Sequence, residues 1–206
     1  RPIAFDANFR IKGKQPELWN PLTSEVRLLP EFKQLTGATS IPMTLAPYES
    51  SFIIFRSEAK EKQTAQNYPE PTLQTELAGP WTISFQEGRG GPAEPLTTDS
   101  LFDWTTSEDP HVKFFSGTAT YKTTFKMKKL PETPLYIDLG KVMVMARVRI
   151  NGQEVGGVWT SPYRLNISQA VRKGLNELEI EVVNCWRNRL IGENRFIVSD
   201  IAGTTR

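Results

Sequence analysis

The sequence is poor in the side chains that cross-link small proteins or build metal centres. Among 206 residues there is one cysteine, Cys185, and one histidine, His111. A single cysteine excludes an internal disulfide framework and a zinc site with several thiolate ligands. A single histidine excludes a histidine-rich metal centre, and any histidine-dependent catalytic triad would have to use His111.

An excess of one charge and long apolar runs are also missing. The 25 Lys and Arg residues nearly balance the 23 Asp and Glu residues, so the formal net charge is +2. Proteins that bind nucleic acid or membrane surfaces need a basic face, so this balance argues against both classes. No stretch approaches the roughly 18 apolar residues of a membrane span, and no signal-peptide pattern is present.

Turn-forming and aromatic residues are plentiful. The chain has 14 Gly and 15 Pro beside 11 Phe, 5 Trp and 5 Tyr. Frequent turns with many aromatic residues are typical of a chain of short strands. The length allows one large domain or one and a half, with a core that needs no cross-links.

The first third of the sequence alternates as strands do. Apolar runs at 41–45 and 51–55 flank the turn-like segment 46–50, which indicates antiparallel strands. Three or four strands are too few to close a sandwich, so residues 1–56 are predicted to be a partial β-sandwich, the end of a preceding domain. The strand-like opening without an initiator Met predicts a piece of a longer protein. Residues 57–75 are polar and Pro-containing and are predicted to be a linker.

Residues 76–206 show regular strands separated by turns. In one run, Ala119, Tyr121 and Thr123 share a side opposite Lys122 and Thr124, the pattern of a half-buried strand. Asn151-Gly152 predicts a tight hairpin, since both central residues of a type I′ turn need φ > 0. One helical turn is predicted at 168–171, with Ser168 as its N-cap. Eight or so strands with almost no helix predict a two-sheet, jelly-roll β-sandwich.

Several motifs in this part resemble a known domain. They are the segment 146–156 around Asn151-Gly152, then Trp159, Pro162-Tyr163, Ile167 and Gly174-Leu175-Asn176. Together they resemble the sugar-binding jelly roll of family 2 glycoside hydrolases. The resemblance implies an all-β, galactose-binding-like jelly-roll sandwich, preceded here by a few strands of a second β-sandwich.

A closer resemblance extends over nearly the whole chain. Segments 115–121, 138–140 and 184–192 resemble the C-terminal part of bacterial α-L-rhamnosidases of glycoside hydrolase family 106, while 19–21 and 50–55 resemble the preceding β-sandwich. In such proteins the catalytic carboxylates lie on a separate barrel domain nearer the N-terminus. No catalytic residue can therefore be assigned in this chain. Gly192-Glu193 departs from the Gly-Asp that relatives often carry.

Sugar binding would rest on exposed aromatic rings that stack on the C–H bonds of a pyranose. Trp104, Trp159 and Tyr163 are the candidates, because each lies at or beside a predicted loop. Packing in the core or at a corner is the competing interpretation for Trp159 and Tyr163. Trp81 is assigned to the core. For Trp186, stacking by an arginine or a buried network is favoured over a ligand site.

The acidic residues do not form a recognisable catalytic pair. Glycosidases need two carboxyl groups about 5–10 Å apart, whereas Glu177, Glu179 and Glu181 follow one strand face and are expected to be solvated. The acids at 103, 108 and 109 are assigned to turn capping rather than calcium binding. No cofactor is expected, and structural calcium stays open. His111 is assigned to a surface loop and Cys185 to a small buried position.

The sequence therefore predicts a non-catalytic, carbohydrate-binding-like accessory region of a secreted glycoside hydrolase. By resemblance, the parent is an α-L-rhamnosidase-like enzyme that degrades polysaccharide in the periplasm or outside the cell. Expected partners are carbohydrate and the parent's other domains, with neither nucleic acid nor a membrane span. The alternative is a purely structural module without sugar affinity.

Overall fold

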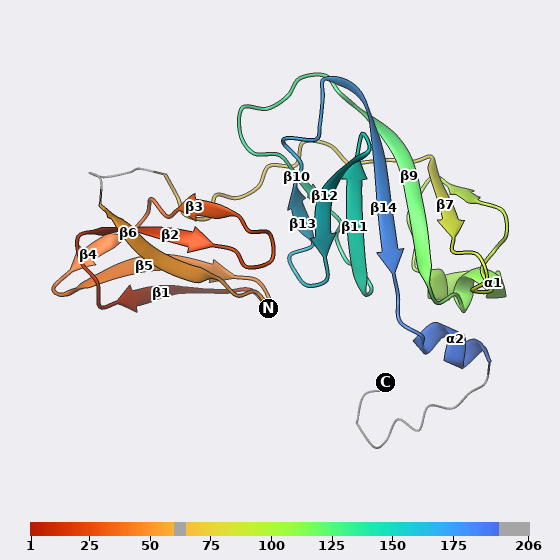
Figure 1. Ribbon diagram of the computed structural model, residues 1–206, viewed down its shortest axis with the longest axis horizontal. Coiled ribbons are helices and arrows are strands. Elements are labelled where there is room, and N and C mark those ends of the chain that lie inside the picture. Colours follow the sequence, from red (N-terminus) through yellow and green to blue (C-terminus); the bar gives the residue numbers. More distant parts are fainter. Residues whose placement is uncertain (60–64, 194–206) are drawn as a thin grey trace, which may run out of the picture. The chain divides into compact units, whose positions relative to one another are not determined.

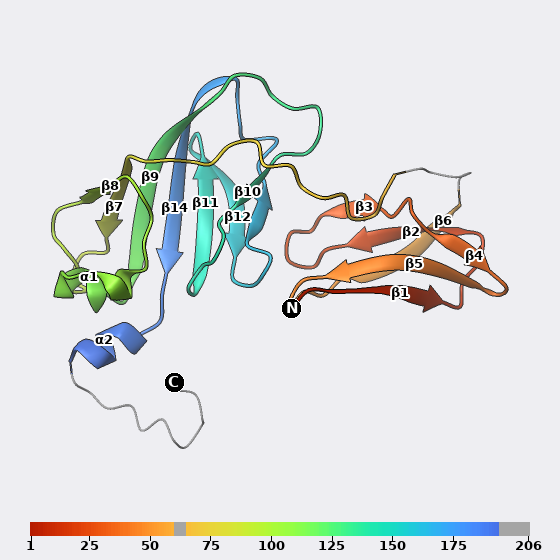
Figure 2. The ribbon, with the colours of Figure 1, turned by 180° about the vertical axis from the view of Figure 1, so that it is seen from behind.

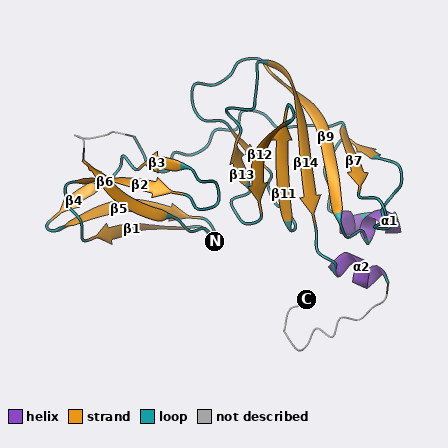
Figure 3. Cartoon of the chain, viewed as in Figure 1, coloured by secondary structure: helices purple, strands orange, loops and turns teal. Residues whose placement is uncertain are grey.

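The computed structural model describes residues 1–59 and 65–193. Strands dominate this part of the chain, and its helices are short (Figure 3). The chain divides into two compact units, one formed by residues 1–75 with 160–162 and the other by residues 76–159 with 163 onward. The all-β prediction is confirmed.

The first unit is a small sandwich of two three-stranded antiparallel sheets (Figure 1). Its strands are β1 (Ile3–Phe9), β2 (Lys14–Trp19), β3 (Val26–Leu28), β4 (Lys33–Leu35), β5 (Ala38–Leu45) and β6 (Phe52–Glu58). One sheet has the order β1-β5-β4 and the other β3-β2-β6. Between them lie the buried side chains of Leu18, Leu29, Ile41 and Met43. The sequence predicted strands of a second β-sandwich before the jelly roll, but only three or four of them; the structure has six, and they enclose a core of their own.

Part of the predicted linker is anchored to the first unit. Asn67 is completely buried. Its Nδ2 donates to the carbonyl oxygens of Glu31 at 2.7 Å and Pro42 at 3.2 Å, while its Oδ1 accepts from the Glu31 N–H. Tyr68 packs against the hydrophobic cluster beside it. Polar composition suggested a solvated segment, but an asparagine amide can be buried when backbone groups satisfy it.

The second unit contains a six-stranded antiparallel sheet with the order β12-β11-β14-β9-β7-β8 and a two-stranded sheet, β10-β13 (Figures 1 and 2). Its strands are β7 (Trp81–Phe85), β8 (Leu96–Thr98), β9 (Thr118–Met127), β10 (Tyr136–Asp138), β11 (Met145–Ile150), β12 (Gln153–Val158), β13 (Arg164–Asn166) and β14 (Gly174–Val183). The described helices are η1 (Trp104–Thr106), α1 (Pro110–Lys113) and α2 (Arg187–Gly192).

Strict alternation along the long strands places the core of the second unit. On β14, Asn176, Leu178 and Ile180 are buried while Leu175 and Glu177 are exposed. The other buried side chains come from both sheets and the loops, and include Trp81, Ile83, Phe85, Phe115, Tyr121, Ile137, Val148, Ile150 and Leu165. The sequence assignment of Trp81 to the core is confirmed.

Two turn predictions had different outcomes. Asn151 and Gly152 have φ values of 53° and 79°, and they join β11 to β12 with Ile150 opposite Gln153, as the hairpin motif predicted. The segment 168–171 forms one hydrogen-bonded turn as predicted, in which the Ile167 carbonyl oxygen accepts from the Ala170 and Val171 N–H groups, but Ser168 is not its cap. Instead of capping a helix, Ser168 Oγ accepts from the Leu135 N–H.

The Gly-x-Asn motif is explained by a buried amide. Asn176 Nδ2 donates to the carbonyl oxygens of Arg172 and Gly174, and its Oδ1 accepts from the Arg172 N–H at 2.8 Å and from Asn151 Nδ2 at 2.9 Å. Asn151 Oδ1 in turn accepts from the Glu177 N–H. The two asparagines therefore satisfy the polar groups at the turn before β14 and tie it to the hairpin.

Candidate functional site

Trp104, one of the three predicted sugar-binding residues, lies in the core. It begins the short helix η1, which Asp103 caps by accepting from the Thr105 N–H. Only 8% of Trp104 is exposed. Its ring meets those of Phe85 and Phe115 edge to face. This burial contradicts the expected loop exposure, because the helix turns the indole onto the sheet, where it has no free face to stack on a sugar.

A polar contact fixes Trp104 further. Its Nε1 donates to the hydroxyl of Tyr121 at 2.5 Å, and the two rings are nearly parallel. Burial raises the pKa of Tyr121 to about 12, an effect that the hydrogen bond from Trp104 only partly offsets. The tyrosine therefore stays protonated and rigidly held over the whole neutral range.

Trp159 and Tyr163 lie nearer the surface. Trp159 follows the last residue of β12 and is 53% exposed. Tyr163 is half-buried against the core of the second unit, and its carbonyl oxygen accepts from the Leu139 N–H. Trp159 therefore has apolar surface to offer a ligand, whereas Tyr163 is mostly engaged in packing.

A second exposed tryptophan is stacked by an arginine, as the sequence interpretation favoured. Trp186 is 61% exposed, and the Arg89 guanidinium lies 5.4 Å from the centre of its ring. Both line a hollow of about 240 Å³ together with Gln86, Ser116 and Asn184. Arginine stacking was expected here, but from a neighbour in sequence. No local signal pointed to Arg89, which precedes Trp186 by almost a hundred residues and lies in a Gly-rich loop.

The polar side chains beside Trp186 are engaged in hydrogen bonds within the second unit. Asn184 Oδ1 accepts from the Gly117 N–H at 2.9 Å and its Nδ2 donates to the Phe115 carbonyl oxygen at 2.8 Å. Ser116 Oγ accepts from the Arg189 N–H. These bonds hold α2 and the end of β14 against the loop before β9, so the motif at 184–192 has a structural task.

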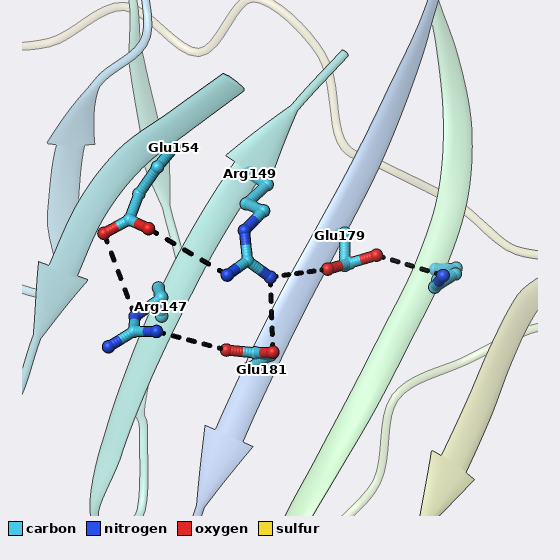
Figure 4. Close-up of polar contacts among 6 residues, drawn as sticks. Arg147, Arg149, Glu154, Glu179 and Glu181 are labelled. Carbon is cyan, nitrogen blue, oxygen red and sulfur yellow. Dashed lines mark hydrogen bonds and ion pairs between the residues drawn. The ribbon is translucent and has the colours of Figure 1, made fainter. Parts of the chain in front are cut away.

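A network of ion pairs covers the outer face of the six-stranded sheet (Figure 4). Arg149 Nη1 contacts Glu179 at 2.9 Å and Glu181 at 3.2 Å, and Lys122 contacts the other oxygen of Glu179 at 3.0 Å. Arg147 is held more loosely, 3.8 Å from Glu181. Of the three carboxylates that were expected to be solvated, Glu179 and Glu181 are paired with cations, whereas Glu177 is exposed as expected.

This pairing is the opposite of what acid catalysis requires. Hydrogen bonds from Lys122 and Arg149 hold the pKa of Glu179 below its ordinary value. A general acid of a glycosidase needs a raised pKa so that it carries a proton at neutral pH. The ionised form of Glu179 is therefore favoured within the ion-pair network that it shares with Glu181 through Arg149.

The remaining acids and the lone histidine do not assemble a metal site. Asp103 and Asp109 accept from the backbone N–H groups of Thr105 and His111, so both act as caps. Within residues 1–59 and 65–193, no group of three His, Cys, Asp or Glu side chains lies close enough to hold a metal ion. His111 lies at the surface in α1 rather than in a loop. Cys185 is exposed, contrary to the buried position expected.

The helices in the described part of the chain are short. None of its helices has the length and apolar composition to cross a bilayer.

Comparisons with known proteins agree with the fold. The chain is 41% identical to a rhamnosidase from Novosphingobium sp. PP1Y, with a TM-score of 0.85 over 93% of this chain and 18% of that one. It is 39% identical over 141 residues to a protein named "Putative beta-glucuronidase" from Formosa agariphila, which covers 65% of this chain and 11% of that protein. The chain thus spans less than a fifth of either relative.

A family match covers much of the second unit, including the four long strands β9, β11, β12 and β14 of its main sheet. Residues 98–195 match the family described as the glycosyl hydrolase 2 galactose-binding domain-like family. The matched stretch contains the Asn151-Gly152 hairpin, the Gly174-Leu175-Asn176 turn and the six ion-paired residues of Figure 4. Over this stretch, which is just under half of the chain, the sequence is therefore similar to that galactose-binding-like family.

Proposed function

We propose that this chain is a non-catalytic accessory region of a secreted glycoside hydrolase whose parent protein resembles an α-L-rhamnosidase. The observation that carries the proposal is the similarity to the Novosphingobium rhamnosidase, at 41% identity over 93% of this chain. Identity at that level over both units is far more specific than a shared β-sandwich architecture.

The chemistry of the acids supports a non-catalytic role. Glu17, Asp103 and Glu179 have pKa values below the ordinary range, each because hydrogen-bond donors stabilise the anion. Each of these groups is a poor proton donor at neutral pH. In this proposal the acid and nucleophile of the parent enzyme belong to another part of its polypeptide.

The domain limits belong to the same proposal. Residues 1–56 would be the end of a preceding β-sandwich domain, 57–75 the linker, and 76–206 the sugar-binding-like jelly roll. The burial of Asn67 and Tyr68 beside the first unit shortens the part of this linker that can act as a free connection. A parent that degrades polysaccharide would work in the periplasm or outside the cell.

The proposed carbohydrate contact is centred on Trp159, with Tyr163 beside it in sequence. The indole of Trp159 is exposed, and a ring of this kind can stack on the apolar face of a pyranose. The contact is expected to be weak, since a single stacked ring contributes only about 1 kcal/mol beyond area burial.

A titration of the chain with sugars tests the carbohydrate contact. Tryptophan fluorescence is followed while rhamnose, galactose or pectic oligosaccharides are added to millimolar concentration. The proposal predicts a saturable change that Trp159→Ala abolishes and Trp186→Ala retains, because Trp186 is a similarly exposed tryptophan elsewhere in the same unit. Loss of the change in Trp186→Ala alone would move the contact to the hollow beside Arg89.

The alternative, a structural module without sugar affinity, is favoured by the internal use of Asn184 and Ser116 and by the half-buried packing of Tyr163. Absence of any fluorescence change for the unsubstituted chain would select this alternative. Release of product from an aryl α-L-rhamnoside by this chain alone would overturn the non-catalytic assignment itself.

A further inference from the structure

The outer face of the sheet β3-β2-β6 in the first unit carries apolar side chains on all three strands. Two cross-strand rows make up this face. Trp19 on β2 is paired with Val26 on β3 and with Phe52 on β6. In the next row, Glu17 is paired with Leu28 and Ile54. Directly opposed residues in a sheet point to the same side, so these six side chains share one surface, called the apolar face below.

This surface is open to solvent. Val26 is 51% exposed, Leu28 47% and Phe52 59%. The side chains that close the interior of the sandwich, such as Leu18 and Ile53, alternate with them on the other side of the same strands. The exposed rows are therefore not part of the first unit's own core. Contiguous exposed apolar rows of this kind are uncommon on free surfaces and mark sites of interaction.

The one acid on the apolar face is neutralised within it. Glu17 Oε2 accepts from Trp19 Nε1 at 3.0 Å and from Arg56 Nη2 at 2.7 Å, and the Arg56 guanidinium lies 5.0 Å from the centre of the Trp19 ring. Only 8% of the Glu17 side chain is exposed. The Arg56 hydrogen bond, followed by that from Trp19, lowers the pKa of Glu17. A partner can thus cover this surface without having to supply a countercharge.

We propose that the apolar face is the surface through which the first unit packs against another domain of the parent glycoside hydrolase. This inference rests on the proposed function, in which the chain is part of a larger enzyme. The chain covers only 18% of the similar rhamnosidase, so in that relative most of the polypeptide lies outside the matched region. The partner would be a mainly apolar patch of this remaining polypeptide.

The size of the apolar face favours a tethered domain over a second copy of the chain. Three exposed side chains (Val26, Leu28 and Phe52) and two partly covered ones (Trp19 and Ile54) offer on the order of 400 Å², about half of what each partner gives to a standard interface between free proteins. Domains joined in one polypeptide have a high effective concentration and need less buried area to stay together. A small apolar surface is therefore better matched to a neighbour on the same chain.

The test compares one double variant, Val26→Lys with Phe52→Glu, in the full-length parent and in the 206-residue chain. In the chain alone the unfolding midpoint should move by no more than about 2 °C, because both side chains project into water. In the parent, hydrogen exchange at β3 and β6 should accelerate roughly tenfold as the contact opens. Tyr48→Glu, at an exposed residue of the turn between β5 and β6 that is not one of the six residues of the apolar face, is the control.

Two results would overturn the inference. Equal exchange rates for the variant and unsubstituted parent would show that no domain covers the apolar face. A concentration-dependent dimer of the chain, lost in the double variant, would assign the apolar face to a second copy. Both readouts are independent of glycosidase activity, which is measured separately, so an inactive parent would count against the proposed function without deciding this inference.

Discussion

The outer faces of the two central sheets differ in their relation to water. On the six-stranded sheet of the second unit, Arg149 joins Glu179 and Glu181 in an ion-pair network. On β3-β2-β6 of the first unit, the corresponding surface carries Val26 and Phe52, both more than half exposed. The charged surface is compatible with exposure to water. The exposed apolar surface is of a kind that is uncommon on free proteins and marks a site of interaction.

The two sheets have similar alternating strand patterns but expose different kinds of side chain to solvent. Both sheets alternate inward and outward residues, and both inward sets build a core. The second unit also places an ion-pair network on the outer face of its main sheet, and its core contains the three mutually packed rings of Phe85, Trp104 and Phe115. We therefore expect the second unit to be the more self-sufficient of the two.

The largest loss of stability is expected from a substitution in the cluster formed by Phe85, Trp104 and Phe115. Trp104→Ala should destabilise the second unit by about 4 kcal/mol, because it leaves a large cavity beside Phe85 and Phe115 and removes the hydrogen bond to Tyr121. Denaturant unfolding followed by near-ultraviolet circular dichroism measures it. Trp186→Ala, at an exposed ring, should cost less than about 1 kcal/mol. Equal losses of unfolding free energy in the two variants would contradict the conclusion that Trp104 belongs to a tightly packed core.

Alkaline pH should weaken the same cluster. The pKa of Tyr121 is raised to about 12 from an ordinary value of 10.0, so the folded protein keeps a proton that the unfolded chain loses. Stability is therefore unaffected below pH 10 and falls by about 3 kcal/mol as the pH rises from 10 to 12. Urea unfolding between pH 9 and 12 measures this loss. Tyr121→Phe should lack this component, and an unchanged slope in that variant would contradict the assignment.

The asparagine pair at the hairpin should matter somewhat less. Asn176→Ala should cost about 2 kcal/mol, because the Arg172 N–H and the Asn151 side chain lose their buried acceptor. Thermal unfolding of the chain provides the measurement. Asn166→Ala is the control, since Asn166 is exposed and caps only Ser168. A cost for Asn176→Ala no greater than that of the control would mean that the buried amide does not organise the turn.

The smallest effect is expected on the charged surface. Arg149→Ala should destabilise the second unit by about 1 kcal/mol or less, because the ion pairs are partly exposed and screened by salt. Arg147→Ala should cost less still, since its carboxylate partners lie at 3.8 and 3.9 Å. Unfolding at low and high salt checks both variants. A large loss of unfolding free energy that persists in high salt would contradict this expectation, because it would show that the ion-pair network stabilises the fold strongly.

Much of the fold could be predicted because it follows from local rules. The alternation around Tyr121, the Asn151-Gly152 hairpin and the position of Trp81 each depend on neighbours in sequence or on period-two patterning. The motifs at 146–156 and 174–176 also identified the domain type that the family match supports. These features require no knowledge of distant contacts.

The candidate site was harder to predict because exposure is a tertiary property. Trp104 lies in a loop-like sequence, yet a helical turn directs its ring onto the sheet. The partner of Trp186 is Arg89, from a distant loop. Asn67 sits in a polar segment, but backbone groups of Glu31 and Pro42 satisfy its amide. In each case the deciding contact joins residues that no local pattern relates.

Side-chain footprinting of the full-length parent and of this chain tests the contrast between the two surfaces most directly. Hydroxyl radicals label exposed side chains, so the labelling of Trp19, Leu28 and Phe52 reports on the apolar face, while Tyr48 calibrates the dose. We predict strong labelling of the apolar face in the chain and protection of all three residues in the parent, with Tyr48 labelled equally in both. Equal labelling of Phe52 and Leu28 in chain and parent would contradict the account.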